Sequence, residues 1–145
     1  MATVFDVADY FLAKTDLELG DIMTNLKIQK LVYYAQGFSM AILGKPLFDE
    51  SIEAWEHGPV CPVLYHKYKG NKAMPIDPGK DLKEASKPFT SRQCKLLDDV
   101  YKTYGCYAAW TLREITHQDT AWHNAYPNGV ITLEAMQESC EARLE

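Results

Sequence analysis

A long run of regularly spaced apolar residues between positions 24 and 44 constrains the fold more than any other feature. Thr24 is a suitable N-cap, and the apolar positions after it recur at intervals of three and four, which places them on one face of a helix. Gly44 provides a left-handed stop, and Pro46 cannot continue the helix. We therefore predict the central helix of a mainly α fold. The stripe consists of Ile28, Leu31, Val32, Ala35, Phe38, Ser39 and Ile42.

Capping signals predict further helices before and after this one. Thr3 precedes an apolar stripe that starts at Val4, and Thr90 with Gln93 resembles a capping box. Pro62 suits the first position of a short helix that Gly70 would end. Three more helical segments are expected in the C-terminal third: Tyr107 to His117, a brief turn capped by Asp119 or Thr120, and a terminal helix opened by Thr132.

One segment follows a strand pattern instead. Ile52 and Ala54 alternate with polar residues before Gly58-Pro59 breaks the chain, so we expect a short strand with Met74 to Ile76 as its pairing partner. Residues 71–88 carry prolines and lysines and are expected to form a long surface excursion. The predicted fold class is a compact helical domain of five or more helices with a small antiparallel β strand pair.

Size and charge limit the function classes. A chain of 145 residues fits a single domain spanning 1–145, which would bury roughly 68–70% of its unfolded surface. Its apolar runs fall short of the roughly 20 residues that span a bilayer, and its start resembles no signal peptide, so we expect a cytoplasmic protein with no membrane partner. The net charge of -5 argues against nucleic acid as the main partner.

Metal chemistry has weak support in the pattern. His57, Cys61 and His66 form the best local group, but the intervening Gly58, Pro59 and Pro62 prevent these side chains from sharing one helical face. His117 and His123 are six residues apart, outside the usual helical spacing of ligands. We therefore expect no metal site and no cofactor.

Cysteine catalysis remains an alternative. Cys61 with His57 or His117 could form a nucleophile and base if the fold brought them together. Its neighbours Val60 and Pro62 suit a buried thiol, and we expect all four cysteines to be reduced and mostly buried. No phosphate-binding loop, dinucleotide fingerprint or nucleophile elbow occurs in the sequence, so we predict that the chain is not an enzyme and has no small-molecule substrate.

Aromatic residues are abundant, with nine Tyr, five Phe and three Trp. Tyr and Trp supply large contact areas at protein interfaces, although each can equally complete the core. Tyr33 and Tyr34 are successive residues about 100° apart on the central helix, so we expect at least one to point away from the buried stripe.

Three segments in a fixed order resemble one family. They carry the patterns K-L-x-Y-Y-A-Q, P-L-F-D-E and A-W-x-x-G-P-V, within Thr24 to Gly37, Lys45 to Glu50 and Ile52 to Val60. Together they resemble the SocA-like antitoxin (Panacea) domain, also called the phage-associated GepA-like domain. Leu112 to Trp122 is similar to the C-terminal part of this domain, which gives a signature region of about 24–125.

This resemblance implies a mostly helical domain of bacteria and phages that neutralises a toxin. The leading hypothesis is an antitoxin that binds a cognate protein toxin, either directly or as an adaptor for an AAA+ protease. A small cysteine- or histidine-dependent enzyme and a phage-derived regulator of a host protein are the alternatives. Some antitoxins of this family carry an additional N-terminal DNA-binding module; only a short predicted helix precedes the signature here, so we do not expect self-repression of an operon.

The predicted partner-binding surface lies where an exposed flank of the central helix meets the segment around the Gly-Pro turn. A rigid turn would hold the preceding side chains in fixed positions, and a tryptophan held in this way can form a hot spot. The residues of this surface are Lys30, Tyr34, Gln36, Trp55, Glu56, His57 and Pro59.

Overall fold

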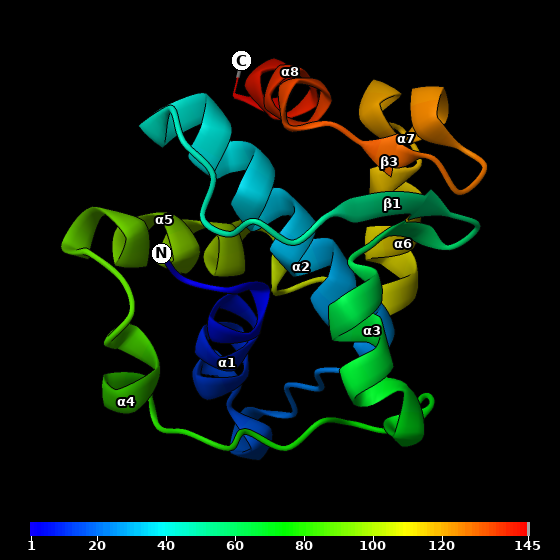
Figure 1. Ribbon diagram of the computed structural model, residues 1–145. Helices are drawn as coiled ribbons and strands as arrows, with labels where there is room; N and C mark the ends of the chain where they lie inside the picture. Colours follow the sequence, from blue (N-terminus) through cyan, green and yellow to red (C-terminus); the bar gives the residue numbers. More distant parts are fainter. Residues whose placement is uncertain (145) are drawn as a thin grey trace.

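The computed structural model describes residues 1–144, apart from the side chain of Leu17, and contains eight α-helices and three short strands in that range (Figure 1). The helices are α1 (Val4–Lys14), α2 (Asn25–Phe38), α3 (Pro62–Tyr68), α4 (Leu82–Ser86), α5 (Ser91–Tyr104), α6 (Ala109–Thr116), α7 (Thr120–Ala125) and α8 (Leu133–Arg143). The strands are β1 (Ile52–Trp55), β2 (Gly58–Val60) and β3 (Val130–Ile131), and short 3-10 or π turns span Leu17–Leu19, Ser39–Leu43 and Lys69–Asn71. The mainly α prediction is confirmed.

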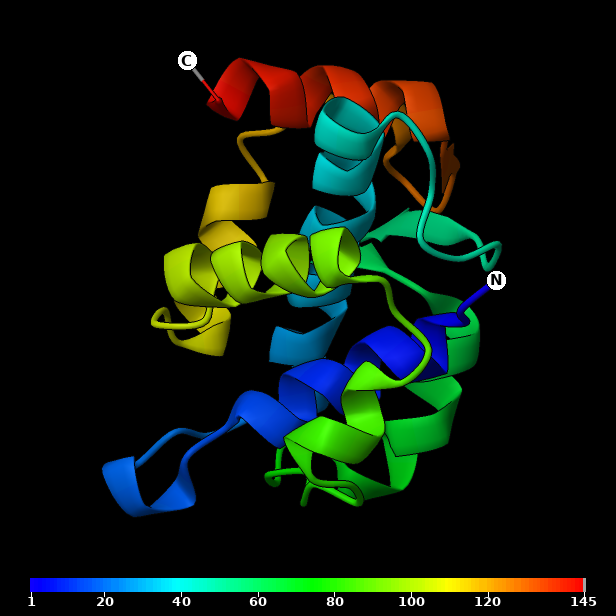
Figure 2. The ribbon, with the colours of Figure 1, turned by 90° about the vertical axis from the view of Figure 1, so that its left-hand side faces the viewer.

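Helix α2 is the centre of the fold. It contacts α1 and α5 on one side, α3, α6 and β2 on the other, and α8 crosses its C-terminal end (Figures 1 and 2). As a result every residue of α2 except Leu26 is buried. The sequence pattern predicted that only one face of this helix is buried. In the structure α2 is covered on all sides, as in a core helix.

The predicted ends of α2 are confirmed by local geometry. The Thr24 side chain accepts a hydrogen bond from the backbone N–H of Lys27, which satisfies one of the free donors of the first turn. After Phe38 the helix continues as the π turn of Ser39–Leu43, and Gly44 ends it with φ +76°. The capping boxes at Thr3 and Thr90 are also present.

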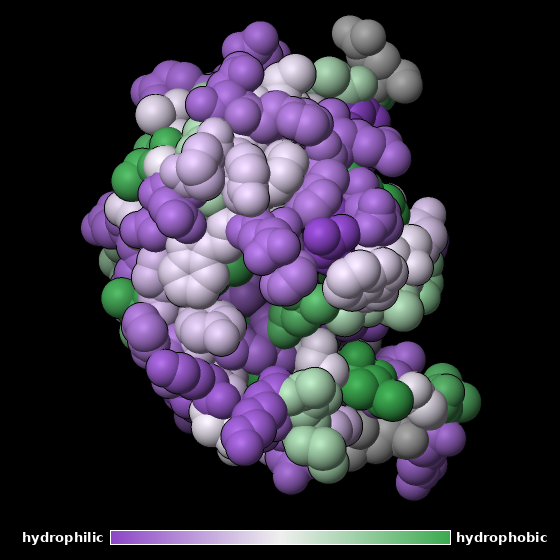
Figure 3. Space-filling model, turned by 90° about the vertical axis from the view of Figure 1, so that its right-hand side faces the viewer, coloured by the Kyte–Doolittle hydropathy of each residue, from purple (hydrophilic) through white to green (hydrophobic). Residues whose placement is uncertain are grey.

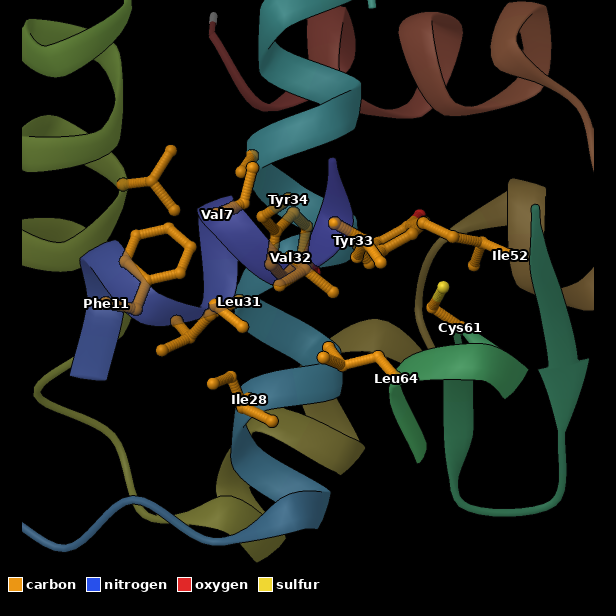
Figure 4. Close-up of a cluster of buried hydrophobic side chains, with 14 of the residues drawn as sticks. Val7, Phe11, Ile28, Leu31, Val32, Tyr33, Tyr34, Ile52, Cys61 and Leu64 are labelled. Carbon is orange, nitrogen blue, oxygen red and sulfur yellow. The ribbon is translucent and has the colours of Figure 1, made fainter. Parts of the chain in front are cut away.

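Apolar side chains on two sides of α2 form one continuous core. Leu31 and Ile28 lie near Phe11 of α1, while Leu64 and Cys61 approach from α3 and the end of β2 (Figure 4). All five side chains are fully buried. This core fixes α3 and the strand region against the middle of α2.

The sheet differs from the prediction in its third member. Strand β1 is central, with Trp55 opposite Gly58 of β2 and Ile52 opposite Ile131 of β3, and both pairings are antiparallel. The expected pairing of Met74 to Ile76 with β1 is wrong. The backbone N–H of Ile76 donates instead to Met23 O at 2.7 Å, which holds this segment beside the start of α2.

The surface excursion at residues 71–88 contains one more helix than expected. Asp81 caps α4 by accepting a hydrogen bond from the backbone N–H of Glu84 at 2.9 Å, and Ala85 is the buried contact of this short helix. Five residues are too few to show a helical repeat in a proline-rich sequence, which is why the pattern did not reveal α4.

Helix α8 packs very closely on α2. A Cβ atom added at Gly37 would lie only 2.4 Å from Cys140 Sγ, so this contact requires a glycine. Close approach at one point brings the whole of α8 across the C-terminal end of α2 (Figure 2).

Within residues 1–144, no helix combines the length and the apolar composition that a bilayer span requires.

Candidate partner-binding surface

The predicted site residues on α2 lie inside the protein. Lys30 and Tyr34 are 0% exposed and Gln36 is 2% exposed, and Pro59 of β2 is buried as well. The expectation that the α2 residues occupy an exposed flank is wrong, because α8, α5 and α6 cover the sides of α2 that the apolar stripe leaves free. These four side chains cannot be the first contact for a partner.

Glutamine side chains of α2 instead hold neighbouring segments in place. Gln36 donates from Nε2 to Phe48 O at 2.7 Å and accepts from the backbone N–H of Leu47 at 2.8 Å. Gln29 accepts from the backbone N–H of Cys61 at 2.9 Å. Both glutamines thereby satisfy backbone groups that would otherwise be buried without a partner.

Lys30 performs the same task for the Gly-Pro turn. Its ammonium group donates to Pro59 O at 3.1 Å, and its aliphatic stem runs beneath Gly58. A Cβ atom at Gly58 would lie 2.7 Å from Lys30 Cε, and Gly58 has φ +112°, so only glycine fits there. Burial, followed by the nearby positive charge of Arg113, lowers the pKa of Lys30 to about 7.

The tyrosine pair of α2 converges on one buried carboxylate. Tyr33 and Tyr34 donate from their hydroxyls to Asp119 Oδ2 at 2.9 and 3.1 Å. Arg143, at the end of α8, forms an ion pair with Asp119 Oδ1 at 2.7 Å, and Tyr34 stacks on Tyr104 with ring centroids 4.2 Å apart. Neither tyrosine points to solvent, because side chains from other helices cover α2 outside the apolar stripe as well. Burial, followed by the charge of Asp119, raises the pKa of both hydroxyls.

The hairpin of β1 and β2 presents the remaining predicted residues. Trp55 is half-buried and meets Tyr65 of α3 edge to face, with centroids 5.1 Å apart. Its indole N–H donates to Glu53 at 3.0 Å, and its backbone carbonyl accepts from Trp122 Nε1 at 2.8 Å. These contacts fix Trp55, so it stands in a defined orientation beside the exposed Glu56 and His57.

A second aromatic group from α6 adjoins the hairpin tip. His57 Nδ1 accepts a hydrogen bond from Arg113 Nε at 3.1 Å, and the Arg113 guanidinium lies over the Trp110 ring, 4.4 Å from its centroid. The Trp110 side chain is 59% exposed. The sequence pattern did not single out Trp110 and Arg113. A signal was present, because residues three apart on a helix are neighbours and Leu112 turns the other face of α6 to the core.

A groove of about 600 Å³ runs along this surface between α2, the hairpin, α3 and α6. Pale aromatic rings lie among purple polar side chains on the face that Figure 3 shows. The groove brings together Trp55, Glu56 and His57 with side chains from four other segments. Its lining residues are Thr24, Asn25, Leu26, Gln29, Trp55, Glu56, His57, Val60, Tyr65, Lys69, Lys72, Ala73, Ala109 and Asn128.

The alternative chemistry gains no geometric support. Cys61 is fully buried at the start of α3, and burial raises the pKa of its thiol to about 11, which keeps it protonated and unreactive at neutral pH. Cys140 is also buried, whereas Cys94 is half-buried and Cys106 is exposed. The prediction of mostly buried cysteines is therefore correct for two of the four. Within residues 1–144, no group of three or more His, Cys, Asp or Glu side chains could hold a metal ion.

The predicted histidine pair lies on either side of one tryptophan. His117 stacks on Trp122 with centroids 4.0 Å apart, and His123 meets the same ring edge to face at 5.1 Å. His117 Nε2 is buried without a hydrogen-bond partner among the described residues, and burial lowers the pKa of this imidazole. The arrangement is one of aromatic packing rather than of metal ligation.

A helical domain whose buried polar residues join its own segments, and whose open groove is lined by aromatic rings, has the features of a protein-binding module. The model of the "Antitoxin SocA-like, Panacea domain" family matches residues 28–123, and the chain belongs to this family. Antitoxin SocA of Caulobacter vibrioides (strain NA1000 / CB15N) is 43% identical to it over 49 residues.

The match to that relative is partial. It covers 34% of this chain and 26% of the relative, so the chain spans about a quarter of the length of the curated protein it matches. No solved structure matches the chain significantly.

Proposed function

We propose that this protein is an antitoxin that binds a cognate protein toxin in the cytoplasm and neutralises it. Membership of the SocA-like family supports the antitoxin role. The observation that supports this binding surface is the pair of exposed side chains Trp110 and His57 beside the groove, which the half-buried Arg113 joins. Because the predicted site residues of α2 are internal, Trp110 and His57 are side chains that remain available to a partner.

The composition of this group suits an interface centre. Trp, Tyr and Arg are the residues most enriched among binding hot spots, where their large side chains fill well-packed pockets that exclude water. Arg113 already stacks on Trp110 and bonds to His57, so these side chains are ordered before a partner arrives. Preorganisation of this kind reduces the entropy lost on binding.

Neutralisation can follow from binding alone or from delivery of the toxin to an AAA+ protease. Coverage of a toxin's active surface needs only this interface, whereas an adaptor needs a second surface for the protease. The two routes differ in the fate of the toxin. Direct inhibition leaves the toxin level unchanged when the antitoxin is induced, and delivery lowers it in a protease-dependent manner.

The test is whether this protein rescues the growth of cells that express the candidate toxin, which is the product of the gene next to its own. Trp110→Ala and His57→Ala should each weaken binding of that protein, with a loss of about 2 kcal/mol, or about 30-fold in Kd, at Trp110. Leu82→Ala on α4, which removes an exposed apolar side chain from another surface, is the control. If both site variants melt normally and neutralise as well as the control, this surface is the wrong one.

A further inference from the structure

Two lysines in the groove have no carboxylate partner within the described part of the chain. Lys69 and Lys72 are exposed, line the groove beyond the C-terminal end of α3, and form no ion pair with any described residue. Glu56 is the one acidic residue in the lining. In a chain with a net charge of -5, this end of the groove therefore has a local charge opposite to that of the whole molecule.

The backbone at Lys72 is held in a conformation that lysine rarely adopts. It has φ +54° and ψ −123°, the geometry of the second residue of a type II′ turn, and the backbone N–H of Met74 closes that turn onto Asn71 O at 2.9 Å. Glycine is the usual residue at this position, because it lacks the Cβ atom that causes the strain. A lysine there is not explained by the turn.

A second residue with positive φ lies in the same groove, but it is an asparagine, which adopts this left-handed conformation readily. Among the described residues, Lys72 and Asn128 are the non-glycine residues with positive φ, and both line it. Disfavoured backbone conformations concentrate where side chains are positioned for a ligand. The strained backbone at Lys72, together with the lysine side chains beside it, indicates a ligand site at this end of the groove.

The groove also contains an apolar subsite next to the lysines. Trp55 and Tyr65 form one wall in a fixed edge-to-face pair, and Leu26, Val60 and Ala109 contribute apolar surface. A ligand that fits both parts carries an apolar or aromatic side chain with carboxylates close to it. Charge complementarity thus favours an acidic peptide.

We propose that the groove binds an acidic segment of the toxin, with an apolar side chain against Trp55 and Tyr65 and carboxylates at Lys69 and Lys72. This inference rests on the proposed antitoxin function and identifies the partner chemistry that its surface recognises.

The first experiment needs no toxin. The ¹⁵N-labelled full chain is titrated by NMR with the peptide acetyl-Glu-Glu-Phe-Glu-amide and with its neutral analogue acetyl-Gln-Gln-Phe-Gln-amide. The acidic peptide should shift the Trp55 indole signal and the amide signals of Lys72 and Asn128, and bind at least about tenfold more tightly than the analogue. Equal affinities, or no shifts at millimolar peptide, would overturn the proposal. The proposal would also be overturned if a thymidine oligonucleotide shifted these signals and the acidic peptide did not.

The second experiment uses the toxin and separates charge from fold. Lys69→Glu with Lys72→Glu should weaken toxin binding at least about tenfold, while Lys83→Glu with Lys102→Glu, which changes the net charge equally, should not. Lys72→Gly relieves the turn, so it should raise the melting temperature and yet lower affinity several-fold.

The outcomes of the second experiment distinguish the two proposals. A parent chain that neither binds nor neutralises the toxin contradicts the antitoxin function, and the peptide titration then decides the groove by itself. The other informative result is a parent chain that neutralises the toxin and a Lys69→Glu, Lys72→Glu variant that binds it as tightly as the Lys83→Glu, Lys102→Glu control. This result contradicts the groove assignment and leaves the antitoxin function intact.

Discussion

Replacement of Asp119 should cause one of the largest losses of stability in this protein. Asp119 is 5% exposed and occupies the N-cap position of α7, where its side chain bonds to α2 and α8 rather than to the first turn of α7. Its two oxygens accept from the hydroxyls of Tyr33 and Tyr34 and from Arg143, so an alanine at 119 removes all of these bonds together.

The magnitude follows from what remains after the change. The two buried tyrosine hydroxyls would lose their acceptor, and the Arg143 guanidinium, whose side chain is 23% exposed, would lose its counter-ion and keep its hydrogen bond to Ile115 O. Removal of one partner of a buried ion pair costs about 3–5 kcal/mol, which we expect for Asp119→Ala. Tyr33→Phe removes one hydrogen bond to a charged acceptor and leaves the ion pair intact, so it should cost about 1.5–3 kcal/mol.

Urea unfolding at pH 7 measures both changes, and a double-mutant cycle isolates the ion pair. Asp119→Ala combined with Arg143→Met should lose at least about 1 kcal/mol less than the sum of the single losses, because the second change removes a charge that is already unpaired. A loss below about 1 kcal/mol for Asp119→Ala, with the denaturant slope unchanged, would refute this account of the network.

Two further predictions concern the Gly-Pro turn. Lys30 has a pKa of about 7 in the fold and an ordinary value of 10.5 when unfolded, so the unfolded chain binds more protons at this group between these values, and the contribution of Lys30 to stability should rise with pH from about 7 to 10. The slope from this group approaches about 1.4 kcal/mol per pH unit, and urea midpoints at pH 8 and 9 should show that Lys30→Met reduces it. Gly58→Ala should cost about 2–4 kcal/mol in the same assay, since its Cβ atom would meet Lys30 and Thr116, whereas Gly44→Ala at φ +76° has open space and should cost about 1–2 kcal/mol. An equal loss at the two glycines would show that the contact at Gly58 is unimportant.

Local chemistry explains which parts of the fold were predictable from sequence. Thr3, Thr24 and Thr90 cap the helices that they were expected to cap, because a cap depends on a side chain and a backbone only three residues apart. The stop at Gly44 is equally local. The partner of β1 was mispredicted because strand pairing is a contact between distant segments, and β3 has only two residues.

The candidate site was less accessible to sequence reasoning than the fold. Tyr34 and Gln36 have large polar side chains, and periodicity alone assigns such residues to the surface. Their burial depends on Asp119 and on the backbone of Leu47 and Phe48, which supply partners from other parts of the chain. For the hairpin, the exposure of Glu56 and His57 was as predicted, and their role in binding stays a prediction.

The position of Arg143 limits how this domain can be cut or transplanted. The family match ends at residue 123, but the cation that neutralises Asp119 comes from the last turn of α8, and Gly37 is shaped to receive Cys140. A fragment designed on the family boundary would keep the buried anion and discard its counter-ion, together with the helix that shields the end of α2. Chimaeras and shortened versions should therefore retain α8, and fusions at the C-terminal side should begin beyond the turn that contains Arg143.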